Sequence, residues 1–169
     1  MDIPIIIKLN KFMDNRGEFY ESYRNEFLEK HNIDFTIVQE NTCISNKNVV
    51  RGFHYQKEPY SQSKLLQVTN GEIKDVLVDL RKGNTYGKVW EFKLNSANKE
   101  LLYIPKGFAH GYSSLKDNTI VSYKMDTLYN KNSECGIHPL SLNVDWEIEN
   151  PIISDKDKNF NYFKLQKKS

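Results

Sequence analysis

Short apolar runs, separated by polar and turn-forming residues, recur along all 169 residues of the chain. Runs of this length, rich in β-branched and aromatic side chains, are typical of β-strands. They predict strands over residues 5–7, 18–23, 36–41, 49–56, 64–69, 72–80, 89–94, 101–104 and 119–125. Residues 24–31 suit about two helical turns, with Phe27 and Leu28 facing inward. Many short strands with so little helix predict a sandwich or barrel, and we expect an all-β, cupin-type jelly-roll barrel with one or two short helices.

Two of these runs, residues 64–69 and 72–80, are separated only by Asn70 and Gly71. Asn-Gly between alternating apolar runs is typical of a tight β-hairpin, so we expect the two runs to pair with each other. In the second run Asp75 and Asp79 share one face. That face either looks at solvent, as is usual for aspartate, or buries the carboxylates beside partners.

The remaining segments carry weaker patterns. Residues 45–48 and 57–60 are expected to be loops or breaks, residues 105–112 are rich in turn formers, and residues 150–157 read as an irregular polar tail. No internal repeat or linker divides the chain. We therefore expect a single domain over residues 1–169.

Composition narrows the classes of partner. The net charge is only +2 with 27% charged residues, which gives no reason to expect nucleic acid or a membrane as partner. No apolar run approaches the ~20 residues of a membrane span, and the first residues lack the basic start of a signal peptide. Cys43 and Cys135 match no metal or redox spacing. We expect a soluble, cytoplasmic protein.

Candidate chemistry is concentrated between Arg51 and Lys64, which enclose His54 among aromatic and apolar residues. Such a set can hold a phosphate, take a proton and stabilise a negative charge, or it can be a surface strand with scattered basic residues. His54 is the best candidate base because imidazole titrates near neutral pH. Tyr123, on a strand, can donate a proton, although most tyrosines at such positions serve packing.

Other classes of chemistry find less support. No second histidine closely follows His54, and His31, His110 and His138 are isolated, so a metal site is not expected. Neither cysteine has a neighbouring histidine, and there is no Gly-x-Ser-x-Gly elbow or glycine-rich phosphate loop. A phosphate would be held by Arg and Lys side chains. Acid–base chemistry remains.

A series of motifs in one order resembles the dTDP-4-dehydrorhamnose 3,5-epimerases, which act on nucleotide-linked 4-keto sugars. The resemblance runs over nearly the whole chain. Its motifs are Asp14-Asn15-Arg16-Gly17 with Phe19 and Glu21, Gln39-Glu40-Asn41, Asn48 to Gln56, Gln62-Ser63-Lys64-Leu65, Gly71-Glu72, Asp75-Val76, Val78 to Arg81, Ile104 to Gly111, Tyr123-Lys124, Glu134, and Ser154 to Asp157.

The resemblance implies a metal-free cupin-type jelly roll, usually a homodimer, that needs no cofactor. It implies inversion of C3, C5 or both in a nucleoside-diphosphate-linked 4-keto-6-deoxy sugar, in deoxysugar biosynthesis for surface polysaccharide. His54 matches the general base, Asp157 the carboxylate that orients it, Tyr123 the general acid and Lys64 the residue near the enolate oxygen. The substrate-binding positions are matched by Arg16, Phe19, Glu21, Gln39, Glu40, Asn41, Arg51, Asp75, His110, Glu134 and Lys156. Asp75 would pair with His110.

Some positions depart from the family pattern. Glu18 stands where an aromatic is usual, Gln67 where an arginine is common, Leu128 for a tyrosine, Glu40 for Asp and Cys43 for Ser. These departures lead to the hypothesis of a variant substrate, such as a GDP-linked 4-keto-6-deoxy sugar or heptose in place of a dTDP-linked one. Three alternatives stay open: a C3-only epimerase, an inactive sugar-nucleotide-binding cupin, and a metal-dependent cupin oxygenase.

Overall fold

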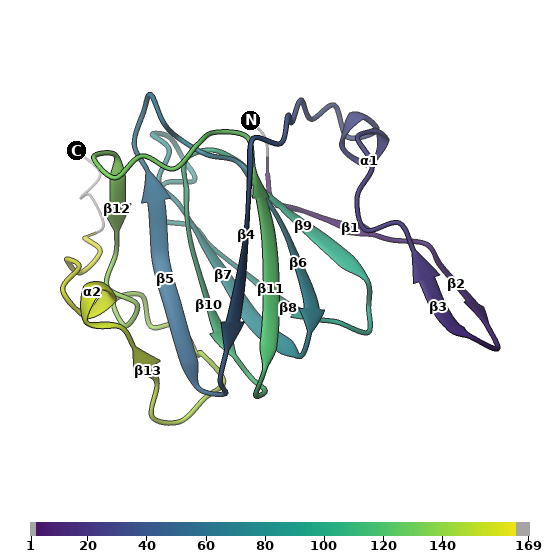
Figure 1. Cartoon of the computed structure of the whole chain (residues 1–169). Coiled ribbons are helices and arrows are strands. Elements are labelled where there is room, and N and C mark those ends of the chain that lie inside the picture. Colours follow the sequence, from purple (N-terminus) through teal and green to yellow (C-terminus); the bar gives the residue numbers. More distant parts are fainter. Residues whose placement is uncertain (1–2, 165–169) are drawn as a thin grey trace.

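The structure, a computed structural model, describes residues 3–164 and is built mainly from β-strands (Figure 1). No helix formed by these residues is long and apolar enough to cross a lipid bilayer. In chain order the elements are β1 (Ile5–Lys8), β2 (Lys11–Asp14), β3 (Gly17–Tyr20), α1 (Glu26–Glu29), β4 (Gln39–Ser45), β5 (Val49–Gln56), β6 (Lys64–Asn70), β7 (Glu72–Asp79), β8 (Val89–Asn95), β9 (Glu100–Ile104), β10 (Phe108–Ser114), β11 (Thr119–Met125), β12 (Glu134–Gly136), β13 (Ile152–Ile153) and α2 (Asp155–Lys158).

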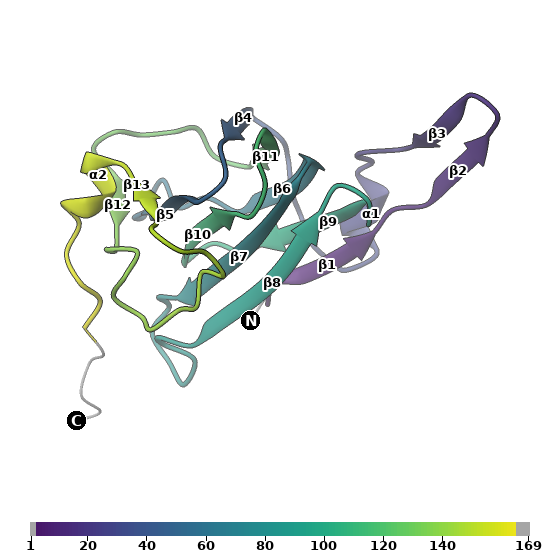
Figure 2. The ribbon, with the colours of Figure 1, turned by 90° about the horizontal axis from the view of Figure 1, so that it is seen from below.

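Two sheets face each other. One has the order β1-β9-β6-β11-β4, and the other has the order β12-β5-β10-β7-β8, with β13 also pairing with β5. All of these pairs are antiparallel except β13 with β5. Figures 1 and 2 show the β2–β3 hairpin projecting from the end of the molecule opposite β12 and α2. The arrangement is the expected cupin-type jelly roll with two short helices.

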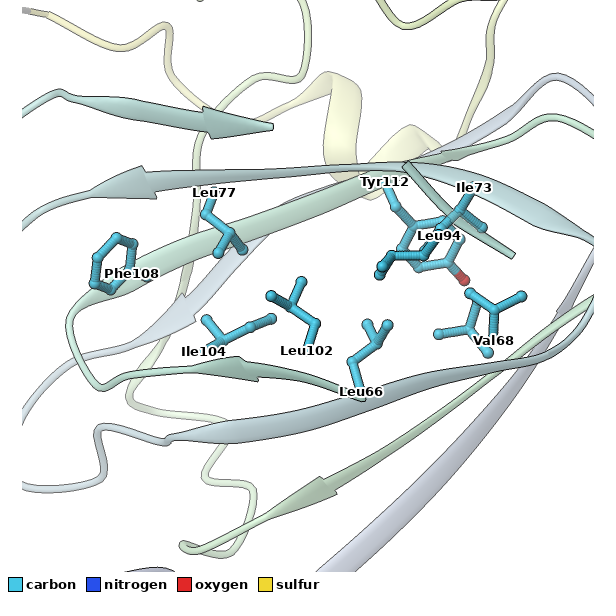
Figure 3. Close-up of a cluster of buried hydrophobic side chains, with 10 residues drawn as sticks. Leu66, Val68, Ile73, Leu77, Leu94, Leu102, Ile104, Phe108 and Tyr112 are labelled. Atoms are coloured by element: carbon cyan, nitrogen blue, oxygen red, sulfur yellow. The ribbon is translucent and has the colours of Figure 1, made fainter. Parts of the chain in front are cut away.

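The main core lies between the two sheets. Figure 3 shows side chains of one sheet pointing toward those of the other, with Leu66 and Leu102 opposite Leu77 and Leu94. Alternation along each strand explains this, because every second side chain points to the same face. Burial of large aliphatic side chains here stabilises the sandwich by roughly 1.5–3 kcal/mol for each one.

Each sheet also buries its outer face. The outer side of the β1-β9-β6 region is covered by α1 and the chain around Phe35, which pack on Leu65 and Tyr103. The outer side of β5, β10 and β7 is covered by residues 137–153, where Trp146 packs at 5.4 Å between ring centroids from Phe53. Strands β6 and β7 therefore bury apolar side chains on both faces, Leu65 and Leu66 of β6 and Val76 and Leu77 of β7 among them.

The expected hairpin at Asn70 and Gly71 is wrong. Strand β6 pairs with β9 and β11, whereas β7 pairs with β10 and β8, so the two runs belong to opposite sheets. Asn-Gly supplies only the reversal: Gly71 has φ of +81°, and a Cβ there would lie 2.3 Å from the Thr119 hydroxyl oxygen. The local sequence permits a sharp turn, but the two arms separate after it, and each is paired along both edges with strands of its own sheet.

Other expectations also need correction. Strand β4 begins at Gln39 rather than at residue 36, and the segment expected to be turn-rich becomes strand β10 from Phe108 onward. The tail expected to be irregular contains β13 and α2, which Ser154 caps by accepting a hydrogen bond from the Asp157 N–H. Asp75 and Asp79 are 0% and 1% exposed, so they are buried beside partners and do not face solvent.

Candidate active site

A cavity of about 360 Å³ lies between the two sheets. Strands β4, β6 and β11 form one wall, and strands β5, β10 and β12 form the other, so the cavity occupies the end of the sandwich that the apolar core does not fill. Its lining includes nine of the side chains predicted as catalytic or substrate-binding: Gln39, Asn41, Arg51, His54, Lys64, His110, Tyr123, Glu134 and Lys156.

A bulge in β5 places Arg51 and His54 on the same wall. Arg51 pairs with Tyr112 and His54 with His110, so three steps along β5 correspond to two steps along β10. Side chains three apart would otherwise point to opposite faces of a strand, and the extra residue restores a common direction. Gly52 permits this geometry, because a Cβ there would lie only 2.5 Å from the Gly111 Cα.

His54 forms a dyad with Asp157. Its Nε2 lies 2.6 Å from Asp157 Oδ1, and the Gly52 N–H donates to Asp157 Oδ2 at 3.2 Å. Burial opposes ionisation of Asp157, but hydrogen bonds from His54, Gly52 and Ser154 outweigh it and hold the pKa of this carboxyl below its ordinary value. An ionised carboxylate only accepts, so Nε2 of the neutral imidazole carries the proton and Nδ1 the lone pair.

Tyr123 lies on the facing wall. It belongs to β11 of one sheet, whereas His54 belongs to β5 of the other, and both line the same cavity. The Asn41 amide donates to the Tyr123 hydroxyl at 3.4 Å, and Cys43 Sγ lies 3.9 Å from the same oxygen. Burial raises the pKa of Tyr123 in spite of the Asn41 hydrogen bond, so the phenol keeps its proton at neutral pH.

Lys64 lines the cavity from the first position of β6. Burial lowers the pKa of its ammonium group to about 8, against the opposing attraction of Asp75 and Glu134. A desolvated cation of this kind interacts strongly with a negative charge that develops nearby, because water screens it little.

His110 is a third basic side chain that lines the cavity, after His54 and Lys64. Its Nε2 lies 2.7 Å from Asp75 Oδ2, which gives the buried carboxylate its partner. Burial lowers the pKa of His110, and this effect outweighs the neighbouring Asp75. The pairing that the family resemblance implied between Asp75 and His110 is therefore present, with Asp75 behind the histidine and not among the lining side chains.

Two further cations lie at the β5 side of the cavity. Arg51 donates to Ser45 Oγ at 3.1 Å and to the Ile44 carbonyl at 3.4 Å, both neutral groups. Lys156, from α2, pairs with Glu134, which also accepts from the Tyr129 hydroxyl at 2.9 Å. Arg51, Lys64 and Lys156 exceed the one lining carboxylate, Glu134, so this cavity favours an anionic ligand.

Four of the predicted binding residues lie away from this cavity. Glu40 is on the outer face of β4, where it accepts from Lys124 at 2.8 Å and Ser122 at 2.6 Å. Arg16 and Phe19 belong to the projecting β2–β3 hairpin, and Glu21 follows it in an ion pair with Arg24. The cavity within one chain does not bring these four side chains to the others.

Sequence reasoning left out several lining residues, namely Cys43, Tyr55, Gln56, Gln62, Tyr112, Met125 and Tyr129. The period of two along a strand could have found Cys43, Tyr112 and Met125, each two residues from a predicted one. The glutamines have a structural task that no local pattern indicates. Gln39, Gln56 and Gln62 hold the backbone of residues 127–130 through hydrogen bonds of 2.6–3.3 Å, and so fix the loop that carries Tyr129.

No three His, Cys, Asp or Glu side chains of residues 3–164 gather closely enough to hold a metal ion. The histidines at the cavity are instead each hydrogen-bonded to one carboxylate, His54 to Asp157 and His110 to Asp75.

Known proteins resemble this chain over most of its length. The model of the family dTDP-4-dehydrorhamnose 3,5-epimerase matches residues 2–164. The enzyme of that name from Shigella flexneri is 42% identical over 94% of this chain and 91% of its own length. A dTDP-4-dehydrorhamnose 3-epimerase from Streptomyces niveus is 33% identical over 86% of this chain and 72% of its own length.

The fold agrees with these sequence matches. The crystal structure of dTDP-4-dehydrorhamnose 3,5-epimerase from Bacillus anthracis strain Ames, with TDP and PPi bound, superposes with a TM-score of 0.92. It is 38% identical and covers 95% of this chain and 94% of that chain. A match of this extent in both sequence and fold shows that the chain belongs to the dTDP-4-dehydrorhamnose 3,5-epimerase family of isomerases.

Proposed function

We propose that the protein inverts C3, C5 or both in a nucleoside-diphosphate-linked 4-keto-6-deoxy sugar, by removing a proton on one face and returning one on the other. The observation that carries this proposal is the position of His54 and Tyr123 on the two facing sheets of one cavity. A carbon atom between them meets a base on one side and an acid on the other. Inversion needs this arrangement, whereas a protein that only binds the sugar nucleotide has no use for it.

In the first step His54 takes the proton from C3 or C5. The C4 carbonyl acidifies both positions, because the electrons of the broken C–H bond move into the carbonyl and form an enolate. Nδ1 accepts the proton, since Asp157 accepts from Nε2 and thereby fixes the tautomer. The ionised carboxylate then stabilises the imidazolium that forms, as it does in other sites with a histidine base.

Lys64 stabilises the enolate oxygen, with His110 beside it. His110 is buried and Lys64 is partly buried, so their dipoles and charge act where water screens less than in bulk solution. A preorganised donor of this kind is typically worth ~3 kcal/mol of barrier lowering. The substrate's own carbonyl serves as the electron sink, so the proposed reaction requires no cofactor.

Tyr123 completes the inversion. Its phenol, protonated at neutral pH, donates a proton to the carbon from the face opposite His54, and the enolate electrons re-form the C–H bond. The resulting phenolate regains a proton from water, and His54 releases its own. The net reaction moves no electrons to or from the protein, and substrate and product differ only in configuration.

The nucleotide is proposed to be dTDP. The solved relative from Bacillus anthracis holds TDP and PPi, and the excess of cations around Arg51 and Lys156 suits a diphosphate. The hypothesis of a GDP-linked sugar or heptose rests on the departures Glu18, Gln67, Leu128, Glu40 and Cys43. Of these five residues, Cys43 lines the cavity of one chain, beside the Tyr123 hydroxyl, and the other four do not, so dTDP is the better supported nucleotide.

We further propose a homodimer in which each hairpin reaches the cavity of the other copy. Phe12, Met13 and Phe19 of the β2–β3 hairpin are 62–67% exposed, which is unusual for apolar side chains that no partner covers. Arg16 and Phe19 match substrate-binding positions of the family, but they belong to the β2–β3 hairpin, which projects from the molecule (Figure 1), and neither lines the cavity of their own chain. A second copy would resolve both observations. Mixing the inactive variants His54→Asn and Arg16→Ala should restore activity if sites are shared.

One experiment tests the central proposal. The protein is incubated in heavy water with dTDP-linked and, separately, GDP-linked 4-keto-6-deoxyglucose, and C3 and C5 are followed by NMR. Deuterium should enter both positions of the dTDP sugar with inversion. Entry at C3 alone would indicate a C3-only epimerase. The Streptomyces niveus relative bears the name of such an enzyme, a 3-epimerase. No entry would indicate an inactive binder, and activity lost on adding a chelator would indicate metal-dependent chemistry.

A further inference from the structure

A space beside His54 is created by a glycine. In the register of β12 with β5, Gly136 is the direct partner of His54. Directly paired residues of antiparallel strands point to the same face, so any side chain at position 136 would stand next to the imidazole. Glycine leaves this place empty of its own side chain. The backbone conformation does not require glycine here, because the φ angle of Gly136 is not positive.

Phe160, two residues after α2, fills that space with its ring. A Cβ added to Gly136 would lie 2.1–2.4 Å from three carbons of the Phe160 ring, so the ring occupies the place of the missing side chain. The Phe160 and His54 rings are 5.8 Å apart between centroids with an interplanar angle of 72°, an edge-to-face contact. Phe160 is not among the residues that line the cavity.

The same short segment carries the other partner of the imidazole. Phe160 follows α2, and its N–H donates to the carbonyl of Asp157 at 3.3 Å. Asp157 makes a hydrogen bond to Nε2 of His54, while the phenyl ring of Phe160 makes an edge-to-face contact with the imidazole ring. The hydrogen bond to Asp157 restrains the ring at Nε2, and 35% of the His54 side chain is exposed. The edge-to-face contact with Phe160, made at another part of the ring, adds a restraint on the ring plane.

We propose that Phe160 is a positioning residue that fixes the plane of the His54 imidazole, so that Nδ1 points at the carbon from which it takes a proton. This inference rests on the proposed role of His54 as the base. Gly136 is part of the same device, because only a residue without a side chain admits the phenyl ring beside the imidazole. The segment from α2 to Phe160 thus supplies both contacts that orient the base, one polar and one aromatic.

The first test compares Phe160→Leu, Phe160→Tyr and the control Tyr162→Leu. Tyr162 lies in the same tail and stacks on His138 at 4.3 Å, away from the dyad. Phe160→Leu should lower kcat about three- to tenfold, the strength typical of such a ring pair, with KM and dTDP affinity unchanged. Phe160→Tyr, which keeps the aromatic ring, should keep kcat near the wild-type value, and Tyr162→Leu should leave kcat unchanged. An equal loss in Tyr162→Leu, or a loss confined to KM, would overturn the proposal.

The second test is a double-mutant cycle with Gly136→Ala, measured on the same dTDP-linked 4-keto sugar. The added methyl should displace the phenyl ring and lower kcat, whereas in the Phe160→Leu background it should change kcat by less than about twofold. Additive losses would contradict the proposal. Unfolding midpoints identify any variant that fails to fold. If Gly136→Ala does not fold, the comparison of Phe160→Leu with Phe160→Tyr and Tyr162→Leu decides. His54→Asn run in parallel separates the two proposals: full activity there removes the proposed base, whereas loss there with unaffected Phe160→Leu removes only the positioning role.

Discussion

On the β5 wall of the cavity, His54 is held by a hydrogen bond of 2.6 Å to a buried carboxylate, which also accepts from the Gly52 N–H at 3.2 Å. On the β11 wall, the Tyr123 hydroxyl accepts from an amide at 3.4 Å and lies 3.9 Å from a thiol, its two hydrogen-bonding contacts within residues 3–164. The base is thus oriented by charge-assisted hydrogen bonds, while the acid is tuned by burial, which raises the pKa of its phenol. The contrast teaches that a proton acceptor needs a fixed tautomer, whereas a proton donor needs only to stay protonated.

Replacing the base should have the largest effect. His54→Asn removes the only group on the β5 wall proposed to accept the proton, so turnover and deuterium exchange at C3 and C5 should fall by roughly 10⁴-fold. Binding of dTDP, measured by calorimetry, should change little. Exchange that continued at the wild-type rate would mean that the base lies elsewhere, and the contrast between the walls would lose its basis.

Replacing the acid should cost less and give a different signature. Tyr123→Phe should lower epimerisation by roughly 10²-fold, because water substitutes poorly for a positioned phenol. His54 would still remove and return protons on its own face, so deuterium should continue to enter the substrate without inversion. NMR of recovered substrate separates exchange from inversion, and equal loss of both would show that the two walls do not act independently.

The pH profile shows whether Lys64 or Tyr123, which share one wall of the cavity, causes the loss of kcat/KM at alkaline pH. Lys64 must be protonated to stabilise the enolate, and its pKa is lowered to about 8, so kcat/KM should fall about tenfold per pH unit above this value. Tyr123, with its pKa raised above 10.0, would produce a fall only at higher pH. Lys64→Arg stays charged throughout and should remove the limb near pH 8. A limb unchanged in that variant would assign it to another group.

Acid stability should show the smallest effect. The pKa of Asp157 is depressed in the folded protein, so its contribution is present above the unfolded value, near 3.8, and is lost as pH falls through the folded value. Each unit of depression corresponds to about 1.4 kcal/mol. Denaturant unfolding should show a gap between wild type and Asp157→Asn at pH 6 that narrows below about pH 4. Tyr123→Phe, which has no charge to lose there, should show a gap that does not change.

Much of the fold was predictable from alternation and turn chemistry. Residues 49–56 and 119–125 form β5 and β11 with the predicted bounds, and both carry the proposed catalytic groups. Alternation does not indicate which strands pair with each other. The prediction that residues 64–69 and 72–80 form a hairpin was therefore wrong, because β6 and β7 belong to different sheets. An apolar residue indicates that a face is buried, but not which sheet buries it.

The site shows the same division. Gln39, Glu40 and Asn41 were predicted together from a motif, yet consecutive residues of a strand point to alternate faces, and Glu40 accordingly lies outside the cavity. A parity argument would have separated it from its neighbours. No pattern along the chain indicates Phe160 beside His54, because that contact joins residues more than a hundred positions apart and depends on the return of the tail over β12.

The bulge in β5 has a consequence for protein engineering. Arg51 and His54 share a wall only because one surplus residue interrupts the pleat between them, so deleting a single residue there would turn the imidazole toward the apolar layer around Trp146. A deletion of the same size in the surface loop after β7, residues 81–88, would leave the facing sheets in register. When this strand is transplanted into another scaffold, its irregular length has to be copied together with its sequence.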